Sequence, residues 1–143
     1  SCELNRAPKA GLHFGFPYIH ASSVIDPEFG APVFPVEPPV VELGPHVAPL
    51  AMKFYTGTMF PERYRGEIFI AGSWNRTPKA GHTGYNITMV NPETGATTIL
   101  IDGWLKNNVA WGRPTDILEM PDGSLLIADD HANVIYRLTY ETP

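Results

Sequence analysis

The run GEIFIA at Gly66–Ala71 returns further along the chain as GSLLIA at Gly123–Ala128. Both runs begin with a glycine and one polar residue and continue with four apolar residues, a pattern typical of a buried strand that follows a turn. When one strand-turn unit recurs along a chain, it indicates a repeated β architecture. We therefore expect an all-β protein that contains two similar units.

Further strands flank each of these runs. In the first unit the expected strands are residues 51–55, 65–71, 85–90 and 97–101, with a turn at Asn91–Gly95. In the second unit they are residues 115–120, 124–129 and 134–140, with a turn at Pro121–Gly123. Four antiparallel strands per unit are typical of a propeller blade. The sequence thus predicts a four-stranded blade at residues 49–110 and an incomplete final blade at residues 111–143.

The second blade has one strand fewer than the first, and two blades alone would leave sheet edges and faces open. Propellers commonly complete their last blade with a strand from the far end of the chain. We expect the missing strand and the remaining blades to come from another segment or another polypeptide.

Residues 1–48 form a different region, rich in proline. Seven of the 15 prolines occur before Val40, and proline fixes φ and lacks a backbone donor. We expect an extended, ordered loop with at most fragments of strand. Its aromatic residues need a surface on which to pack.

Bulk properties exclude some classes of protein. The formal net charge of −5 argues against a nucleic-acid partner, which needs a basic surface. No apolar run approaches the ~20 residues of a membrane-spanning helix. Cys2 is the single cysteine, so an internal disulfide is excluded, and the thiol is either free or bridged to another chain or to a missing N-terminal portion.

Several short motifs of the sequence occur together in a known family. They are ELNR at Glu3–Arg6, FGFPY at Phe14–Tyr18, DPEFG at Asp26–Gly30, ELGPHVAPL at Glu42–Leu50, GSWNR at Gly72–Arg76 and WGRP at Trp111–Pro114. In this order, and over nearly the whole chain, the sequence resembles the pyrroloquinoline-quinone (PQQ)-dependent glucose/sorbosone dehydrogenases, in their C-terminal portion.

The resemblance implies a six-bladed propeller that binds PQQ over its central channel, with calcium nearby, and that oxidises sugars in the periplasm or as a secreted enzyme. It implies a complementary N-terminal propeller segment as partner, a sugar as substrate, and a cytochrome as a candidate electron acceptor. The family's catalytic histidine lies several blades N-terminal to these residues, so the chain alone is not expected to be active.

The resemblance also assigns site residues. His46, Arg76 and Arg113 match cofactor-cleft positions, and arginine suits the carboxylates and quinone oxygens of PQQ. Each has a structural alternative: His46 capping a turn, Arg76 pairing with a surface carboxylate, and Arg113 stacking on an aromatic ring. Calcium is expected at the Glu3 carboxylate and the Phe14 carbonyl, since this cation prefers oxygen ligands; a solvated Glu3 is the alternative.

Asp129 and Asp130 are adjacent in sequence but are not expected to act as a catalytic pair. Neighbouring strand residues point to opposite faces, so we expect them to end the strand and cap the following turn.

The chain departs from the family at several positions. Many relatives carry cysteine where Ile19 stands, histidine where Ala71 stands, and an acidic residue where Cys2 stands. These departures support an alternative function, in which a degenerate propeller serves as a non-catalytic binding or scaffold module.

Overall fold

A computed structural model describes residues 1–72 and 82–141. These residues form five small antiparallel sheets and a single 3-10 turn, η1 (Glu62–Tyr64), with no α-helix among them. The chain is therefore all-β, as its turn-rich and β-branched sequence predicts. It divides into two compact units, residues 1–45 and 46–143.

The first unit contains only short strands. β1 (Cys2–Leu4) pairs with β4 (Val41–Gly44), and β2 (Ile19–His20) pairs with β3 (Val24–Ile25). The loops between them are ordered by backbone hydrogen bonds, including Glu37 N to His13 O at 2.8 Å. The prediction of an extended loop with fragments of strand is confirmed.

Aromatic packing gives this unit its own small cluster. The rings of His13 and Phe34 lie 4.5 Å apart, and Tyr18 meets Phe34 at 5.2 Å and Phe29 at 6.1 Å, the last two pairs edge to face. Edge-to-face contacts at such distances are favourable. The aromatic residues of the proline-rich region therefore pack on one another.

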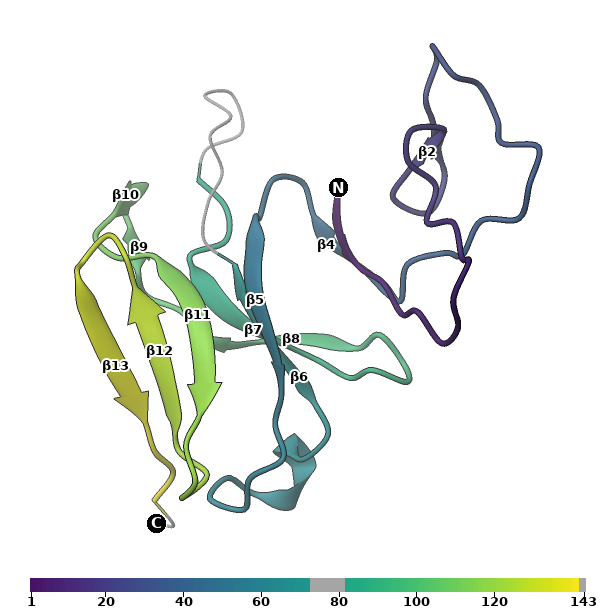
Figure 1. Ribbon diagram of the computed structural model, residues 1–143. Helices are drawn as coiled ribbons and strands as arrows, with labels where there is room; N and C mark the ends of the chain where they lie inside the picture. Colours follow the sequence, from purple (N-terminus) through teal and green to yellow (C-terminus); the bar gives the residue numbers. More distant parts are fainter. Residues whose placement is uncertain (73–81, 142–143) are drawn as a thin grey trace. The chain divides into compact units, whose positions relative to one another are not determined.

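The second unit begins with a four-stranded sheet in simple up-and-down order (Figure 1). Its strands are β5 (Pro49–Phe54), β6 (Ile68–Gly72), β7 (Asn86–Val90) and β8 (Thr97–Ile101). These are the four strands that the sequence predicts for the first unit of the repeat, with ends shifted by a few residues.

A three-stranded sheet of the same up-and-down order follows, formed by β11 (Pro114–Glu119), β12 (Leu125–Asp129) and β13 (Val134–Leu138). The repeated runs of the sequence supply β6 and β12, the second strand of each sheet. Between the two sheets lies a hairpin that the sequence analysis missed, β9 (Leu105–Lys106) with β10 (Val109–Ala110).

The two larger sheets pack on each other through β11, which contacts both β5 and β6. Alternate residues of each strand point into the shared core, as the period of two requires. The buried cluster consists of Tyr55, Phe69, Ala71, Tyr85, Ile87, Trp104, Ile117, Leu125 and Ile127. This core places the loops before β7 and β11 and the turn after β12 around one cavity.

A tight contact joins the loops at the other end of the sheets. The buried Tyr55 hydroxyl donates to Gly123 O at 2.9 Å and accepts from Phe60 N at 3.0 Å. Gly57 and Gly123 approach so closely that a Cβ on Gly57 would lie 2.8 Å from the Gly123 Cα. Gly123 also has φ +84°, a conformation that glycine adopts without strain.

No helix in the described part of the chain has the length and apolar character needed to cross a membrane.

Candidate functional site

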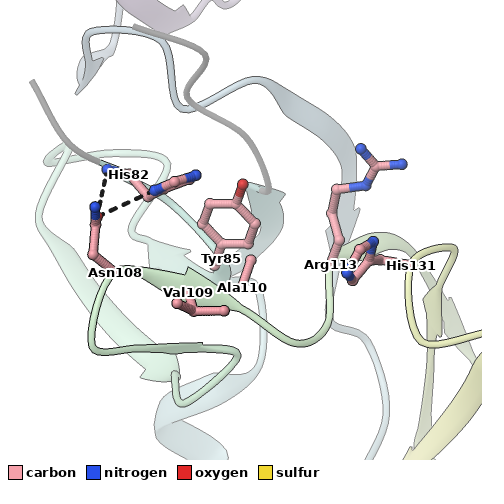
Figure 2. A pocket seen from close by; sticks show the side chains of 7 residues that line it. All are labelled: His82, Tyr85, Asn108, Val109, Ala110, Arg113 and His131. Atoms are coloured by element: carbon pink, nitrogen blue, oxygen red, sulfur yellow. Dashed lines mark hydrogen bonds between the residues drawn. The ribbon is translucent and has the colours of Figure 1, made fainter. Parts of the chain in front are cut away.

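A cavity of about 320 Å³ opens between the two larger sheets of the second unit (Figure 2). His82 and Tyr85 reach it from the loop before β7, Arg113 from just before β11, and His131 from the turn after β12. The β9–β10 hairpin contributes the remaining lining residues, which are Asn108, Val109 and Ala110. The cavity thus combines an apolar floor with several polar groups, the usual composition of a small-molecule site.

The β9–β10 hairpin is built to present Asn108. Its two connecting residues, Asn107 and Asn108, have φ +51° and +60°. Two consecutive left-handed residues are the mark of a type I′ turn, which favours asparagine and glycine. The Asn108 Oδ1 lies 3.1 Å from both the backbone N and the ring Nδ1 of His82, so this turn anchors the histidine.

Tyr85 occupies the cavity wall in an unusual backbone conformation. It has φ +58° and follows Gly84, which has φ +83°. A bulky residue in the left-handed region stores about 1–3 kcal/mol of strain, and such strain is concentrated at functional sites. Burial raises the pKa of the Tyr85 hydroxyl, and the positive charge of Arg113 opposes this rise.

Arg113 is held by a bidentate ion pair. Its Nε and Nη2 donate to the two carboxylate oxygens of Asp130, each at 2.6 Å. The pair raises the pKa of Arg113 and lowers that of Asp130. Among the described residues nothing accepts a hydrogen bond from Nη1.

Asp129 organises the backbone beneath this ion pair. It is only 3% exposed, and its Oδ1 accepts from the backbone N of Arg113, His131 and Ala132 at 2.8–3.0 Å. Burial acts to raise the pKa of Asp129, but these bonds and one from the Tyr136 hydroxyl outweigh it and lower the pKa. As predicted, Asp129 ends the strand and caps the turn, whereas the Asp130 side chain pairs with Arg113 instead of capping the turn.

The close packing around Gly112 explains why a glycine precedes Arg113 in the WGRP motif. A Cβ at this position would lie 2.3 Å from Asp129 Oδ2 and 2.4 Å from the Trp104 ring, so no larger residue fits without movement. The glycine lets the chain pass against the aspartate and brings Arg113 to the edge of the cavity.

The other residues singled out from the sequence lie elsewhere. His46 is exposed, with φ +58°, in the connection between β4 and β5, and is not among the cavity-lining residues. Arg76 lies outside the described residues. Glu3 and Phe14 belong to the first unit, both half-buried.

Glu3 has one feature relevant to a cation. Its Oε1 accepts from Asn5 Nδ2 at 3.1 Å, whereas its Oε2 is buried without a hydrogen-bond partner in the described chain. An unpartnered carboxylate oxygen fits a calcium ligand. No cluster of three or more His, Cys, Asp or Glu side chains suited to a metal occurs in residues 1–72 and 82–141.

Sequence reasoning identified Arg113 but missed the other polar residues of the cavity, namely His82, Tyr85, Asn108 and His131. The Asn107–Asn108 pair was a usable signal, because two residues that tolerate positive φ between short apolar runs indicate a type I′ hairpin. His82 stands in a loop and His131 in a turn, where no periodic pattern marks them.

The described chain is therefore an all-β protein with a small polar cavity at the junction of two sheets. Over 150 aligned positions it is 39% identical to an uncharacterized protein of Borreliella burgdorferi (strain ATCC 35210), in an alignment covering 97% of this chain. The chain spans about 39% of the length of that relative. No protein-family model and no solved structure matches it.

Proposed function

We propose that this chain forms part of the cofactor cleft of a PQQ-dependent sugar dehydrogenase-like propeller, as its C-terminal fragment or subunit. The observation that carries the proposal is Arg113, which the resemblance assigns to the quinone and which lines the cavity, with no acceptor for its Nη1 among the described residues. Two successive up-and-down sheets that pack on each other are the arrangement expected of adjacent blades.

Arg113, the arginine among the described lining residues, suits an anionic cofactor. When bound, PQQ would supply the hydride-accepting centre. Arg113 would hold one of its carboxylates or quinone oxygens by charge-assisted hydrogen bonds, while Asp130 keeps the guanidinium in one orientation. Fixed positive charge close to the quinone also stabilises negative charge that develops there.

The remaining parts of the proposal follow the resemblance. Calcium would bind Glu3, whose buried Oε2 lacks a partner, together with the Phe14 carbonyl. The exposed edge of β13, with Val134 and Ile135 43% and 69% exposed, would pair with a strand of the complementary propeller segment. The assembled enzyme would oxidise a sugar in the periplasm or outside the cell, with a cytochrome as its candidate electron acceptor.

Cofactor binding is the direct test. PQQ titrated into the full chain with calcium, followed by quinone absorbance, should show saturable binding that Arg113→Ala weakens about tenfold or more, because a hydrogen bond to a charged group contributes about 1.5–3 kcal/mol. Arg137→Ala is the matched control, since Arg137 also pairs with an aspartate, Asp122, but does not line the cavity. Equal loss in both variants, or no binding, would contradict the proposal.

Activity is a second test. Mixing the chain with the complementary propeller segment, PQQ and calcium should give sugar-dependent dye reduction. A folded complex that reduces no dye would favour the alternative, a non-catalytic binding or scaffold propeller. One observation agrees with that alternative: Arg113 is satisfied in part by its ion pair with Asp130.

A further inference from the structure

Tyr136 joins the last strand of the described chain to the residue that supports the cavity. It lies in the middle of β13, opposite Ile127 of β12, and its ring packs against the buried core. Its hydroxyl donates a hydrogen bond to Asp129 Oδ2 at 3.0 Å. A side chain of an edge strand is thus bonded to a carboxylate that is almost fully buried.

The two oxygens of Asp129 divide their hydrogen bonds between β13 and the cavity. Oδ2 accepts from Tyr136, whereas Oδ1 accepts from the backbone N of Arg113, His131 and Ala132 at 2.8–3.0 Å. Arg113 and His131 both line the cavity. Because the two oxygens belong to one planar group, the bond at Oδ2 also sets where Oδ1 points. The Tyr136 hydroxyl therefore orients the carboxylate that holds this side of the cavity.

The ring of Tyr136 also contacts the support of a second wall of the cavity. It meets the buried Trp104 ring edge to face, with the ring centroids 5.7 Å apart. The Trp104 carbonyl accepts from Trp111 N at 3.0 Å, which closes the base of the β9–β10 hairpin. That hairpin supplies further lining residues of the cavity. One side chain of β13 thus contacts the supports of both walls.

β13 itself has little support on its outer side (Figure 1). In the described chain it pairs with β12 alone, and its residues Val134 and Ile135 are exposed. The other edge strand of this sheet, β11, packs on β5 and β6. Exposed backbone hydrogen bonds and few buried contacts are typical of a segment that opens at a low cost in free energy. In the proposed enzyme, a strand of the complementary segment would hold this edge in place.

We propose that β13 couples its open edge to the cavity, with Tyr136 as the positioning residue that acts through Asp129 on the backbone of Arg113 and His131. A partner strand that orders β13 then favours the ligand-binding arrangement of the cavity. By linkage, a ligand that fixes Arg113 favours strand pairing by the same factor. The inference rests on the proposed function only for the identity of the partner strand and of the ligand.

Hydrogen exchange of the full chain, followed by NMR, tests the role of Tyr136. Tyr136→Phe removes only the hydroxyl. It should speed exchange at the amides of Arg113, His131 and Ala132 roughly 3- to 10-fold relative to the amides of β7, because one hydrogen bond changes an opening equilibrium by that factor. Tyr55→Phe is the matched control, since it removes a buried hydroxyl at the other end of the sheets and should leave this ratio unchanged. Equal ratios in the two variants overturn the role of Tyr136.

The link from the edge to the cavity is tested with a second substitution. Ile135→Gly loosens β13 without emptying the core, because Ile135 is exposed and glycine weakens a strand. It should speed exchange at the Arg113 amide, just before β11, and should do so much less when Tyr136→Phe is already present. Ile99→Gly, at an exposed position of the edge strand β8, is the control and should leave Arg113 unchanged. No effect of Ile135→Gly on Arg113, or effects of the two substitutions that simply add, overturns the coupling.

Cofactor binding measures the consequence for the cavity. In a titration with PQQ and calcium, followed by quinone absorbance, Tyr136→Phe should bind about 3- to 10-fold more weakly than the wild type. Tyr55→Phe should bind with unchanged affinity. Equal affinity of the wild type and Tyr136→Phe overturns the effect on the cavity and leaves the proposed function standing. If the wild type binds no PQQ, the proposed function fails, while the exchange results still decide whether β13 and Arg113 are coupled.

Discussion

Asp129 shows how much structure one buried carboxylate supports in this protein. Three backbone N–H groups, of Arg113, His131 and Ala132, converge on its Oδ1, and the Tyr136 hydroxyl donates to Oδ2 at 3.0 Å. A buried donor left without an acceptor costs about 1–3 kcal/mol. Asp129 therefore supports three features at once: the start of β11, the turn after β12, and the side of the cavity that Arg113 lines.

We predict that Asp129→Ala lowers the free energy of unfolding by about 2–4 kcal/mol, because several donors lose their common acceptor. Urea denaturation followed by tryptophan fluorescence measures the change. Asp130→Ala, one position along, should lower it far less, since its ion pair with Arg113 is solvent-exposed. Equal losses in the two variants would show that the convergent hydrogen bonds contribute little.

The lowered pKa of Asp129 also predicts an acid dependence of stability. Some carboxyl groups have a lower pKa in the folded chain than in the unfolded chain. Such a group stabilises the fold at pH values above its pKa in the unfolded chain, about 3.9. That contribution disappears as pH falls through the lower folded value. Denaturation curves at decreasing pH should therefore show a smaller acid-induced loss in the free energy of unfolding for Asp129→Ala than for the wild type. Equal losses in the two proteins as the pH falls would argue against this.

At the scale of elements, the hydroxyl of Tyr55 joins the loop after β5 to the turn between β11 and β12. It donates to Gly123 O and accepts from Phe60 N in a buried position. The two sheets are thus linked by a hydrogen-bonded side chain in addition to their shared apolar core.

Removing only this hydroxyl, with Tyr55→Phe, should lower the free energy of unfolding by about 1–3 kcal/mol, because a buried carbonyl and a buried N–H lose their partner. Thermal or urea unfolding measures the loss. Tyr64→Phe is the control: its hydroxyl accepts an exposed hydrogen bond from Arg63. If Tyr55→Phe is as stable as the control, the contact between the loops is not energetically important.

The elements also show what sequence reasoning captured. All seven strands of the two larger sheets were predicted because each has a run of apolar or β-branched residues bounded by turn residues, as at β8 (Thr97–Ile101). The hairpin of β9 and β10 was missed because two-residue strands are too short to have a period. The propeller itself remains a proposal.

The cavity was harder to predict than the strands. Arg113 was identified by its motif, but its neighbours reach the cavity from a loop and two turns, and their convergence depends on how the sheets pack. His82 and Asn108 are 26 residues apart, and no local pattern links them. The positive φ of Tyr85 is a tertiary effect that its own sequence does not favour.

For the molecule as a whole, the notable feature is the contrast between a four-stranded and a three-stranded sheet of the same order. The outer edge of β13 pairs with no other strand in the described chain, and an unpaired edge presents free N–H and C=O groups for another strand. The exposed Ile135 gives such a strand an apolar neighbour.

We predict that addition of the complementary propeller segment protects the outward-facing amides of β13 from hydrogen exchange. In the chain alone these amides should exchange much faster than those of β12, which is paired on both sides. Mass spectrometry of the exchanged chain, with and without the segment, measures the difference. Unchanged exchange at β13 in a formed complex would place the partner elsewhere.

In the proposed propeller, the open edge of β13 also bears on assembly. Backbone pairing is largely indifferent to the identity of the incoming strand, so a second copy of the chain would compete for the same position in concentrated solution. A strand tethered within the same polypeptide acts at an effective concentration of about millimolar, well above that of any free competitor. A covalent link between this chain and the complementary segment would then protect against misassembly. The link would not be needed to form the sheets themselves.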